Sequence, residues 1–239
     1  MGMSPLMIDH RFFYSNRGIG NYTCGIAREA VACVLWGYGD NSFGVTQKLT
    51  SLEQYIDNES VIGFFLECAI LQTIQSNGLK VDGLSNAMPM ITYRGFPTFD
   101  TNRSLALYVP CSYNFRGIDG IILRMDREKR RAYLFPLQVT VAKRHGDSEQ
   151  SFFNDWDRWV RGFEGFEVEV TFLWITAKDP SVEDKDEAYR SHRSGKVLKN
   201  PAFCSRNISF EDVNKTVWDR YAKALKEKKN RDQNMLATL

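Results

Sequence analysis

Residues 117–143 read GIDGIILRMDREKRRAYLFPLQVTVAK, and this stretch decides the fold. Two mostly apolar runs, 117–126 and 131–143, flank the polar sequence DREKR. Apolar runs of this length on either side of a short charged connection are typical of neighbouring β-strands. The stretch therefore predicts two antiparallel strands joined by a hairpin.

The sequence on either side of this hairpin predicts two more strands, LALYVP at 105–110 and EVEVTFLWITA at 167–177. Between the hairpin and the last strand, Asp147 and Gln150 form a capping-box pattern that starts a helix over about 148–163. Its apolar positions recur at helical spacing, and we expect them in the core rather than on a stacking surface: Phe152, Phe153, Trp156, Trp159, Val160 and Phe163. A crossover helix lets the strand after it run parallel to an earlier one. The pattern predicts an α/β or α+β domain with one mixed sheet.

The remaining segments predict further helices and loops, without a domain boundary. Residues 80–103 contain Met-Pro and Phe-Pro steps and predict irregular structure, and the charged residues 178–196 predict an exposed loop. Helices are expected at 23–37 and about 60–76, and a last helix begins near Ser209 and ends near Lys228 before a frayed polar tail. We expect one domain, with these parts: the whole chain 1–239, a core of about 60–177, an N-terminal helical extension of about 9–50 and a C-terminal helix of about 209–228.

The composition narrows the class of protein. The formal net charge is +2 over 239 residues, so overall charge gives no argument for nucleic-acid binding. The five cysteines are scattered and include no CxxC motif, which is typical of reduced thiols in an intracellular protein. No apolar run approaches the roughly 20 residues of a membrane span, and the first residues lack the layout of a signal peptide. We expect an intracellular protein without a membrane partner.

Two acidic residues stand alone in apolar surroundings. Glu67 is the only charged residue in VIGFFLECAIL (61–71), and Asp119 lies in NFRGIDGIIL (114–123) two residues after Gly117. A buried carboxylate needs a partner, because leaving it unpaired costs several kcal/mol. Glu67 on a polar edge or paired with an arginine, and Asp119 as an ordinary turn residue, are the alternatives to a functional site.

Gln138 lies in the middle of the longest predicted strand. With the period of two of a β-strand, Gln138 and Thr140 share one face, while Val139 and Lys143 share the other. A helix glutamate, a strand aspartate and a polar pair on the adjacent strand form the layout of a metal-dependent nuclease. Magnesium accepts a carboxylate, an amide carbonyl and waters as ligands, and would activate water beside a phosphate.

These elements resemble the restriction-endonuclease-like, or PD-(D/E)XK, superfamily. More closely, the chain resembles the Crinkler and retrotransposon hot spot proteins, above all their trypanosomatid branch. The resemblance rests on DHRFFYSNRGIGNYTCGIAREAV (9–31), YVPCSYNFRGIDGIIL (108–123), FPLQVTVAKRHGDSEQSFFNDWDRW (135–159) and VTFLWI (170–175). It implies a central mixed β-sheet of αβββαβ order, with Glu67, Asp119 and Gln138 as metal ligands for Mg²⁺ or Mn²⁺.

The resemblance also implies an intracellular, often nuclear, module that usually follows an ATPase domain in a longer polypeptide. No GxxxxGK[ST] motif occurs in this sequence, so any such ATPase would lie outside these 239 residues. Nucleic acid, partner proteins and that ATPase module are the partners it implies.

The chain departs from the superfamily pattern at its third strand. Gln138 replaces the usual acid, and Thr140 stands where a lysine is usual. Lys143, Arg144 and His145 follow at the strand's end, where they could contact phosphate, although a histidine there is also a common structural residue. Gln138 is therefore either a ligand in a modified metal site or the trace of a lost one.

Three functions follow from these two readings of Gln138. The first is a nuclease-like module with a degenerate metal site that binds nucleic acid or partner proteins. The second is an active Mg²⁺-dependent phosphodiesterase that uses Glu67, Asp119 and Gln138, with Thr140 and Lys143 in the catalytic site. The third is a domain that serves only to assemble a larger ATPase complex.

Overall fold

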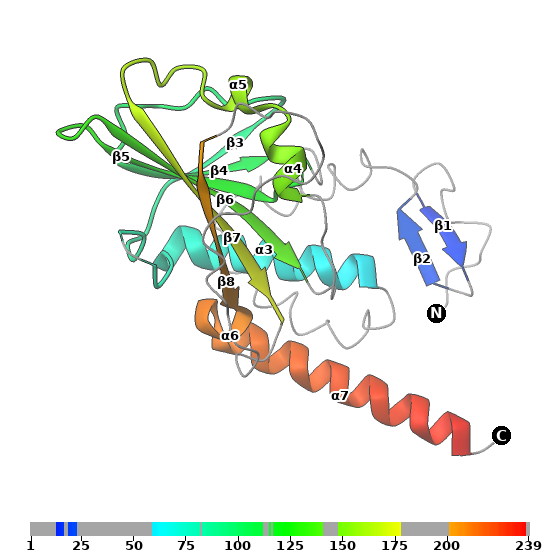
Figure 1. The fold of residues 1–239 in the computed structure, drawn as a ribbon. Coiled ribbons are helices and arrows are strands. Elements are labelled where there is room, and N and C mark those ends of the chain that lie inside the picture. The colour runs from blue at the N-terminus through cyan, green and yellow to red at the C-terminus, as the bar shows by residue number, and fades with distance from the viewer. Residues whose placement is uncertain are drawn as a thin grey trace. The chain divides into compact units, whose positions relative to one another are not determined.

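A computed structural model describes residues 13–16, 19–22, 59–81, 83–111, 115, 117–140, 148–177 and 201–237. The chain divides into two compact units, Met1–Cys68 with Thr216–Leu239, and Ala69–Lys215. The elements, in chain order, are β1 Phe13–Asn16, β2 Ile19–Tyr22, α3 Glu59–Asn77, β3 Met90–Tyr93, β4 Leu105–Pro110, β5 Gly120–Asp126, β6 Arg131–Thr140, α4 Ser148–Phe153, α5 Trp156–Trp159, β7 Glu167–Thr176, β8 Phe203–Ser209, α6 Phe210–Val213 and α7 Lys215–Ala237 (Figure 1).

The second unit, Ala69–Lys215, contains a six-stranded mixed sheet in the order β3-β4-β5-β6-β7-β8. Strands β4, β5 and β6 are antiparallel neighbours, whereas β6 and β7 are parallel, as are β7 and β8. The prediction of one mixed sheet, with the strand after the crossover helix parallel to an earlier one, is confirmed. The mixed α/β class follows from this sheet and the helices beside it.

The β5–β6 hairpin has the antiparallel register that the opening stretch predicts, with Asp126 opposite Arg131 and Gly120 opposite Leu137. Its turn is closed by Asp126, whose Oδ1 accepts the backbone N–H of Lys129 at 3.0 Å. That backbone hydrogen bond holds the pKa of the Asp126 carboxyl below its usual range. β5 begins at Gly120 instead of Gly117, and residues 141–143, the predicted end of the second strand, lie outside the described part of the chain.

One face of the sheet packs against the aromatic residues of α4 and α5. Phe152, Phe153, Trp159 and Phe163 are buried in this cluster, and Trp156 and Val160 pack against it, which confirms that the stripe belongs to the core. The predicted continuous helix over 148–163 is wrong, because it breaks after Phe153. Asn154 and Asp155, which are weak helix formers, lie between α4 and α5. At the end of α4, the Phe152 carbonyl accepts a hydrogen bond from the Trp159 indole N–H at 3.0 Å.

The opposite face of the sheet meets α3 at Gly120. A Cβ on this glycine would lie 3.4 Å from side-chain atoms of both Leu71 and Leu107, and 3.3 Å from the Tyr108 carbonyl oxygen. The absence of a side chain at Gly120 therefore allows the close approach of α3 to β5. Thr73, two residues after Leu71, accepts a hydrogen bond from the Asn214 side chain at 2.8 Å.

Two further strands were not predicted. The segment 80–103, expected to be irregular, contains β3, and β8 was not predicted because FCSRNIS has few apolar residues. The N-terminal extension contains the antiparallel pair β1–β2 among its described residues, and the helix expected at 23–37 lies outside them. Strands of four residues are too short to give a periodic signal.

The last helix begins as predicted but is divided. The Ser209 side chain accepts the Asp212 N–H at 3.0 Å, which is the expected cap. At Asn214 the backbone becomes extended, and α7 then continues to Ala237 instead of fraying after Lys228. Residues 229–237 read KNRDQNMLA, and six of these nine (Lys, Arg, Gln, Met, Leu and Ala) are strong helix formers.

Among the described helices, none combines the length and the apolarity that a membrane crossing requires. Of the described cysteines, Cys68, Cys111 and Cys204 form no disulfide.

Candidate functional site

The loop that leads into β5 places Asp119. Gly117 has a φ of +74°, and a Cβ on it would lie 2.8 Å from the Ser148 Cα at the start of α4. Only glycine suits both the left-handed backbone and this close approach. Asp119 follows, and its backbone N–H donates to the Leu137 carbonyl at 2.8 Å, which fixes the aspartate beside the end of β6.

The Asp119 carboxylate acts as an acceptor for the neighbouring strand. Pairing between β5 and β6 ends at Gly120 and Leu137, but β6 continues to Thr140. Oδ2 of Asp119 accepts the Val139 N–H at 2.7 Å and the Gln138 side-chain Nε2 at 2.9 Å. The carboxylate thus takes the place of a backbone carbonyl for Val139, and Asp119 itself is buried, at 4% exposed. Hydrogen bonds of this kind stabilise the charged form of a carboxyl group.

Gln138 is the partner of Asp119 on β6. Its Nε2 donates to Asp119, whereas its carbonyl oxygen Oε1 is buried and has no hydrogen-bond partner in the described part of the chain. Such a buried unsatisfied acceptor costs about 1–3 kcal/mol. Thr140 lies on the same face of β6 and is also buried. We call Asp119 and Gln138 the carboxylate–amide pair.

Glu149 is a buried acid that the sequence reasoning assigned no role. It lies on α4, and its Oε1 accepts the Trp174 indole N–H at 3.0 Å and the Ser205 hydroxyl at 3.0 Å. Trp174 is the β7 neighbour of Gln138 in the parallel register, so the same face of the sheet carries the carboxylate–amide pair and the donors to Glu149. A sequence signal existed, because Glu149 precedes Phe153, Trp156 and Val160 by four, seven and eleven residues and so shares their stripe.

The described structure does not test whether the other predicted site residues lie beside this pair. Glu67 lies in α3 at a partly exposed position, and it belongs to the unit Met1–Cys68 with Thr216–Leu239. The carboxylate–amide pair belongs to the other unit, so convergence of Glu67 with Asp119 and Gln138 stays a prediction. Lys143, Arg144 and His145 lie outside the described residues.

The donor set of the pair can be tested against a divalent ion. Mg²⁺ and Mn²⁺ take oxygen ligands, and Mg²⁺ is often bound by one or two carboxylates with several waters. The Asp119 carboxylate and the unpartnered Gln138 carbonyl fit two positions of such a shell. Among the described residues, no group of three or more His, Cys, Asp or Glu side chains converges to hold a metal ion. The pair alone therefore fits a weakly held, largely hydrated ion.

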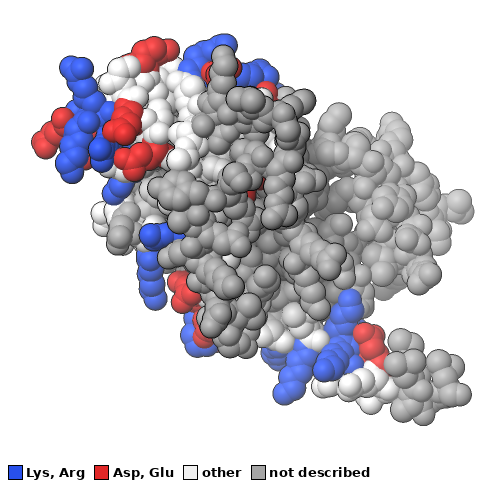
Figure 2. Space-filling model, viewed as in Figure 1, with Lys and Arg blue, Asp and Glu red and all other residues white. Residues whose placement is uncertain are grey.

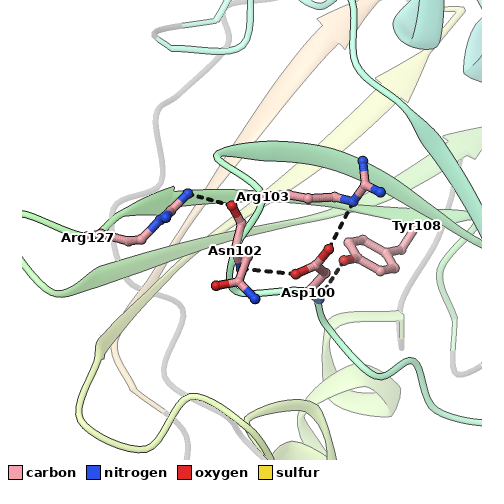
Figure 3. A network of polar contacts seen from close by, with 5 residues as sticks. All are labelled: Asp100, Asn102, Arg103, Tyr108 and Arg127. Atoms are coloured by element: carbon pink, nitrogen blue, oxygen red, sulfur yellow. Dashed lines mark hydrogen bonds and ion pairs between the residues drawn. The ribbon is translucent and has the colours of Figure 1, made fainter.

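A second polar cluster lies in the loop before β4 and provides a contrast (Figure 3). The Asp100 carboxylate accepts the Asn102 N–H at 3.0 Å and the Arg103 Nε at 3.0 Å, and the Asp100 N–H donates to the Tyr108 hydroxyl at 2.8 Å. Arg127 donates to the Asn102 carbonyl. We call these five residues the Asp100 network.

The fold and the site define a mixed α/β chain with a buried carboxylate–amide pair beside the β5–β6 hairpin. Comparison with family models, with curated proteins and with solved structures finds no match to this chain.

Proposed function

We propose that this chain is a nuclease-like module of the Crinkler and retrotransposon hot spot type that binds nucleic acid in the nucleus. In this proposal the fold is restriction-endonuclease-like, and the metal site is degenerate. The chain order is α3, β3, β4, β5, β6, α4–α5, β7, and it supports the proposed fold if β3 is an edge strand added to the αβββαβ order of that superfamily.

The hydrogen bond from Gln138 Nε2 to Asp119 Oδ2 carries the proposal of a degenerate site. Two carboxylates at these positions would repel each other, and a bound cation would relieve that repulsion. An amide at position 138 removes the need for the cation, because its N–H donates directly to the Asp119 oxygen. The same oxygen also accepts the Val139 N–H, so the strand ends are held together without metal.

Nucleic-acid binding in this proposal does not depend on a divalent ion. Lys143, Arg144 and His145 follow β6 in the sequence, and we propose them as phosphate contacts near the pair. Binding to DNA or RNA should then be equal, within about twofold, in EDTA and in Mg²⁺, whereas it should weaken steeply with salt, as phosphate contacts do.

The test measures binding of labelled duplex DNA and single-stranded RNA by fluorescence anisotropy, with cleavage followed on gels in Mg²⁺ and Mn²⁺. Asp119→Asn is the matched variant, because an asparagine carbonyl still accepts from Val139 while the negative charge is lost. It should bind as tightly as the unmodified protein or tighter. The double variant Lys143→Ala with Arg144→Ala should weaken binding. The slope of log K against log salt should become smaller in magnitude by about one for each cation removed.

A second candidate function is an active Mg²⁺-dependent phosphodiesterase, and the unpartnered carbonyl of Gln138 favours it. In this candidate, Asp119 and Gln138 hold the ion with Glu67 as a third ligand, while Thr140 and Lys143 belong to the same site. The ion would activate water and neutralise the scissile phosphate. The protein's own contribution is to hold two oxygen ligands in a buried place beside the strand ends.

Cleavage separates the two candidates. If the unmodified protein cleaves and Asp119→Asn abolishes cleavage, the phosphodiesterase is correct and the degenerate site is wrong. If the protein binds but does not cleave with either metal, the binder is supported. If neither DNA nor RNA binds, nucleic acid is the wrong partner, and the resemblance points instead to partner proteins or to an ATPase module.

A further inference from the structure

The helix α7 contains a strongly basic segment. Residues 220–231 read RYAKALKEKKNR, with six basic side chains and one acidic side chain, a net charge of +5. The whole chain carries +2, so the remaining residues together carry −3. Figure 2 shows blue side chains outnumbering red along the described part of this helix. The near-neutral total therefore conceals a strongly basic segment.

The apolar stripe of α7 ends before most of this charge. Val217, Tyr221 and Ala224 are buried and follow one another at spacings of four and three, which places them on one face of the helix. From Leu225 to Asn234, none of the described side chains is buried. Ten helical residues span about 15 Å. Every described side chain from Leu225 to Asn234 is therefore at least partly exposed to solvent.

The one acidic residue within this segment does little to offset the charge. The Glu227 carboxylate lies 3.6 Å from the Lys223 Nζ, and both side chains are about half exposed or more. An exposed pair of this kind contributes little free energy and does not prevent the lysine from meeting another anion. Lys226 and Lys229 are exposed as well, at positions three residues apart on the helix.

The surroundings of these charges favour one kind of anion. A helix that lies in a membrane interface needs an apolar face opposite its basic face, and a helix that pairs with another helix needs an apolar seam. Leu225, 41% exposed, is the only large hydrophobic residue exposed among the described side chains. A nucleic-acid backbone, in contrast, presents closely spaced phosphates and requires only cations that can reach them.

We propose that residues 220–231 of α7 form a contact surface for the phosphate backbone of nucleic acid. This inference rests on the proposed nucleic-acid binding and gives it a second location, separate in sequence from Lys143 and Arg144. This contact should not depend on the base sequence, because lysine side chains bind phosphates as point charges and phosphate contacts carry no sequence information.

The experiment compares two double variants of the full chain. Lys226→Gln with Lys229→Gln removes two charges from α7, and glutamine keeps nearly the helix propensity of lysine. Lys80→Gln with Lys129→Gln removes two exposed charges from the unit Ala69–Lys215 and gives the same net charge. Circular dichroism checks that both variants keep their helix content. Affinity for a labelled 20-base-pair DNA is measured by anisotropy between 50 and 200 mM KCl.

We expect the α7 variant to bind about tenfold more weakly at 50 mM KCl, with the slope of log K against log salt reduced by about two. The matched variant should change the affinity by less than about twofold, since it leaves every charge of α7 in place. Random-sequence and defined-sequence duplexes should lose affinity equally.

Three results would overturn the inference. Equal losses in the two double variants would mean that net charge, not α7, drives binding, while the proposed function would stand. Loss of binding to phosphatidylserine vesicles in the α7 variant, with DNA affinity unchanged, would assign the charge to a lipid surface. Failure of the unmodified protein to bind nucleic acid at all would overturn both this inference and the proposed function.

Discussion

The carboxylate–amide pair and the Asp100 network both centre on an aspartate in the unit Ala69–Lys215, but their partners come from different places. Asp100 finds its hydrogen bonds in its own loop and on Tyr108, and its side chain is 41% exposed. Asp119 is buried and binds across to the next strand, where Gln138 keeps an unpartnered carbonyl. We infer that the Asp100 network holds a loop in place, whereas the carboxylate–amide pair keeps a carbonyl oxygen, Gln138 Oε1, that could accept a hydrogen bond or ligate a cation.

The largest effect is expected when the buried aspartate is removed. Asp119→Ala leaves the Val139 N–H and the Gln138 Nε2 without their acceptor in a buried place, and each such loss costs about 1–3 kcal/mol. The free energy of unfolding should fall by about 3 kcal/mol, measured by urea denaturation. Asp119→Asn, which keeps an acceptor oxygen, should cost clearly less. Equal losses in both variants would show that charge, and not the hydrogen bonds, stabilises the pair.

The second effect tests whether the amide replaces a cation. Gln138→Glu places a second carboxyl group against Asp119, and two like charges raise the pKa of the pair. The folded state then binds a proton more tightly than the unfolded state, so stability is kept at low pH and lost as pH rises through the raised pKa. At pH 7 without metal we expect a loss of about 2 kcal/mol, smaller at pH 5.

Divalent metal should reverse this loss. Adding 1 mM Mn²⁺ at pH 7 should raise the melting temperature of Gln138→Glu but leave Gln138→Met unchanged, because methionine offers no oxygen ligand. If Mn²⁺ stabilises neither Gln138→Glu nor the unmodified protein, the pair is not a metal site in any form.

The third effect concerns the exposed aspartate. Asp100→Ala removes acceptors from Asn102 and Arg103, but both groups can turn to water. The loss should be about 1 kcal/mol or less, as is usual for exposed polar contacts. Urea denaturation under the same conditions as for Asp119→Ala makes the two regions directly comparable. A loss as large as that of Asp119→Ala would remove the distinction between them.

The smallest effect at neutral pH is expected for Tyr108→Phe, and it grows with pH. Burial raises the pKa of the Tyr108 phenol, although the hydrogen bond from the Asp100 N–H acts in the opposite direction. The folded state therefore holds the phenol proton more tightly, so this stability is present below about pH 10, the usual pKa of tyrosine, and is lost as pH rises above it. Tyr108→Phe should make the unfolding free energy less dependent on pH between about 9.5 and 11. An unchanged alkaline profile would assign that dependence to other groups.

The parts of the fold that the sequence predicted are those set by short-range pattern. The DREKR connection and the apolar runs beside it predicted the hairpin, and its register places Asp119 next to Gln138 once Asp126 pairs with Arg131. The helical spacing of the aromatic residues predicted a core-facing stripe. These features depend on alternation and spacing within about 30 residues, which a single sequence carries.

The parts that the sequence did not predict depend on contacts between distant segments. Glu149 becomes a buried acceptor only because Trp174 and Ser205 reach it from β7 and β8. At the break near Asn154, the Trp159 indole N–H donates a hydrogen bond to the Phe152 carbonyl. At the break between α6 and α7, the Asn214 side chain donates one to the Thr73 hydroxyl. Asparagine and aspartate are compatible with both a helix interior and a break, so tertiary contacts decide between them.

Gly117 has a consequence for how the protein can vary. Its backbone conformation disfavours any side chain, and an added Cβ would meet the Cα of Ser148 at 2.8 Å and the Ser148 carbonyl oxygen at 3.1 Å. In a saturation-mutagenesis library, position 117 should therefore tolerate substitution as poorly as the buried core does. A second-site suppressor should not arise by trimming the side chain at position 148, since the nearest opposing atoms belong to its main chain. A lineage that lost this glycine would have to move the whole start of α4.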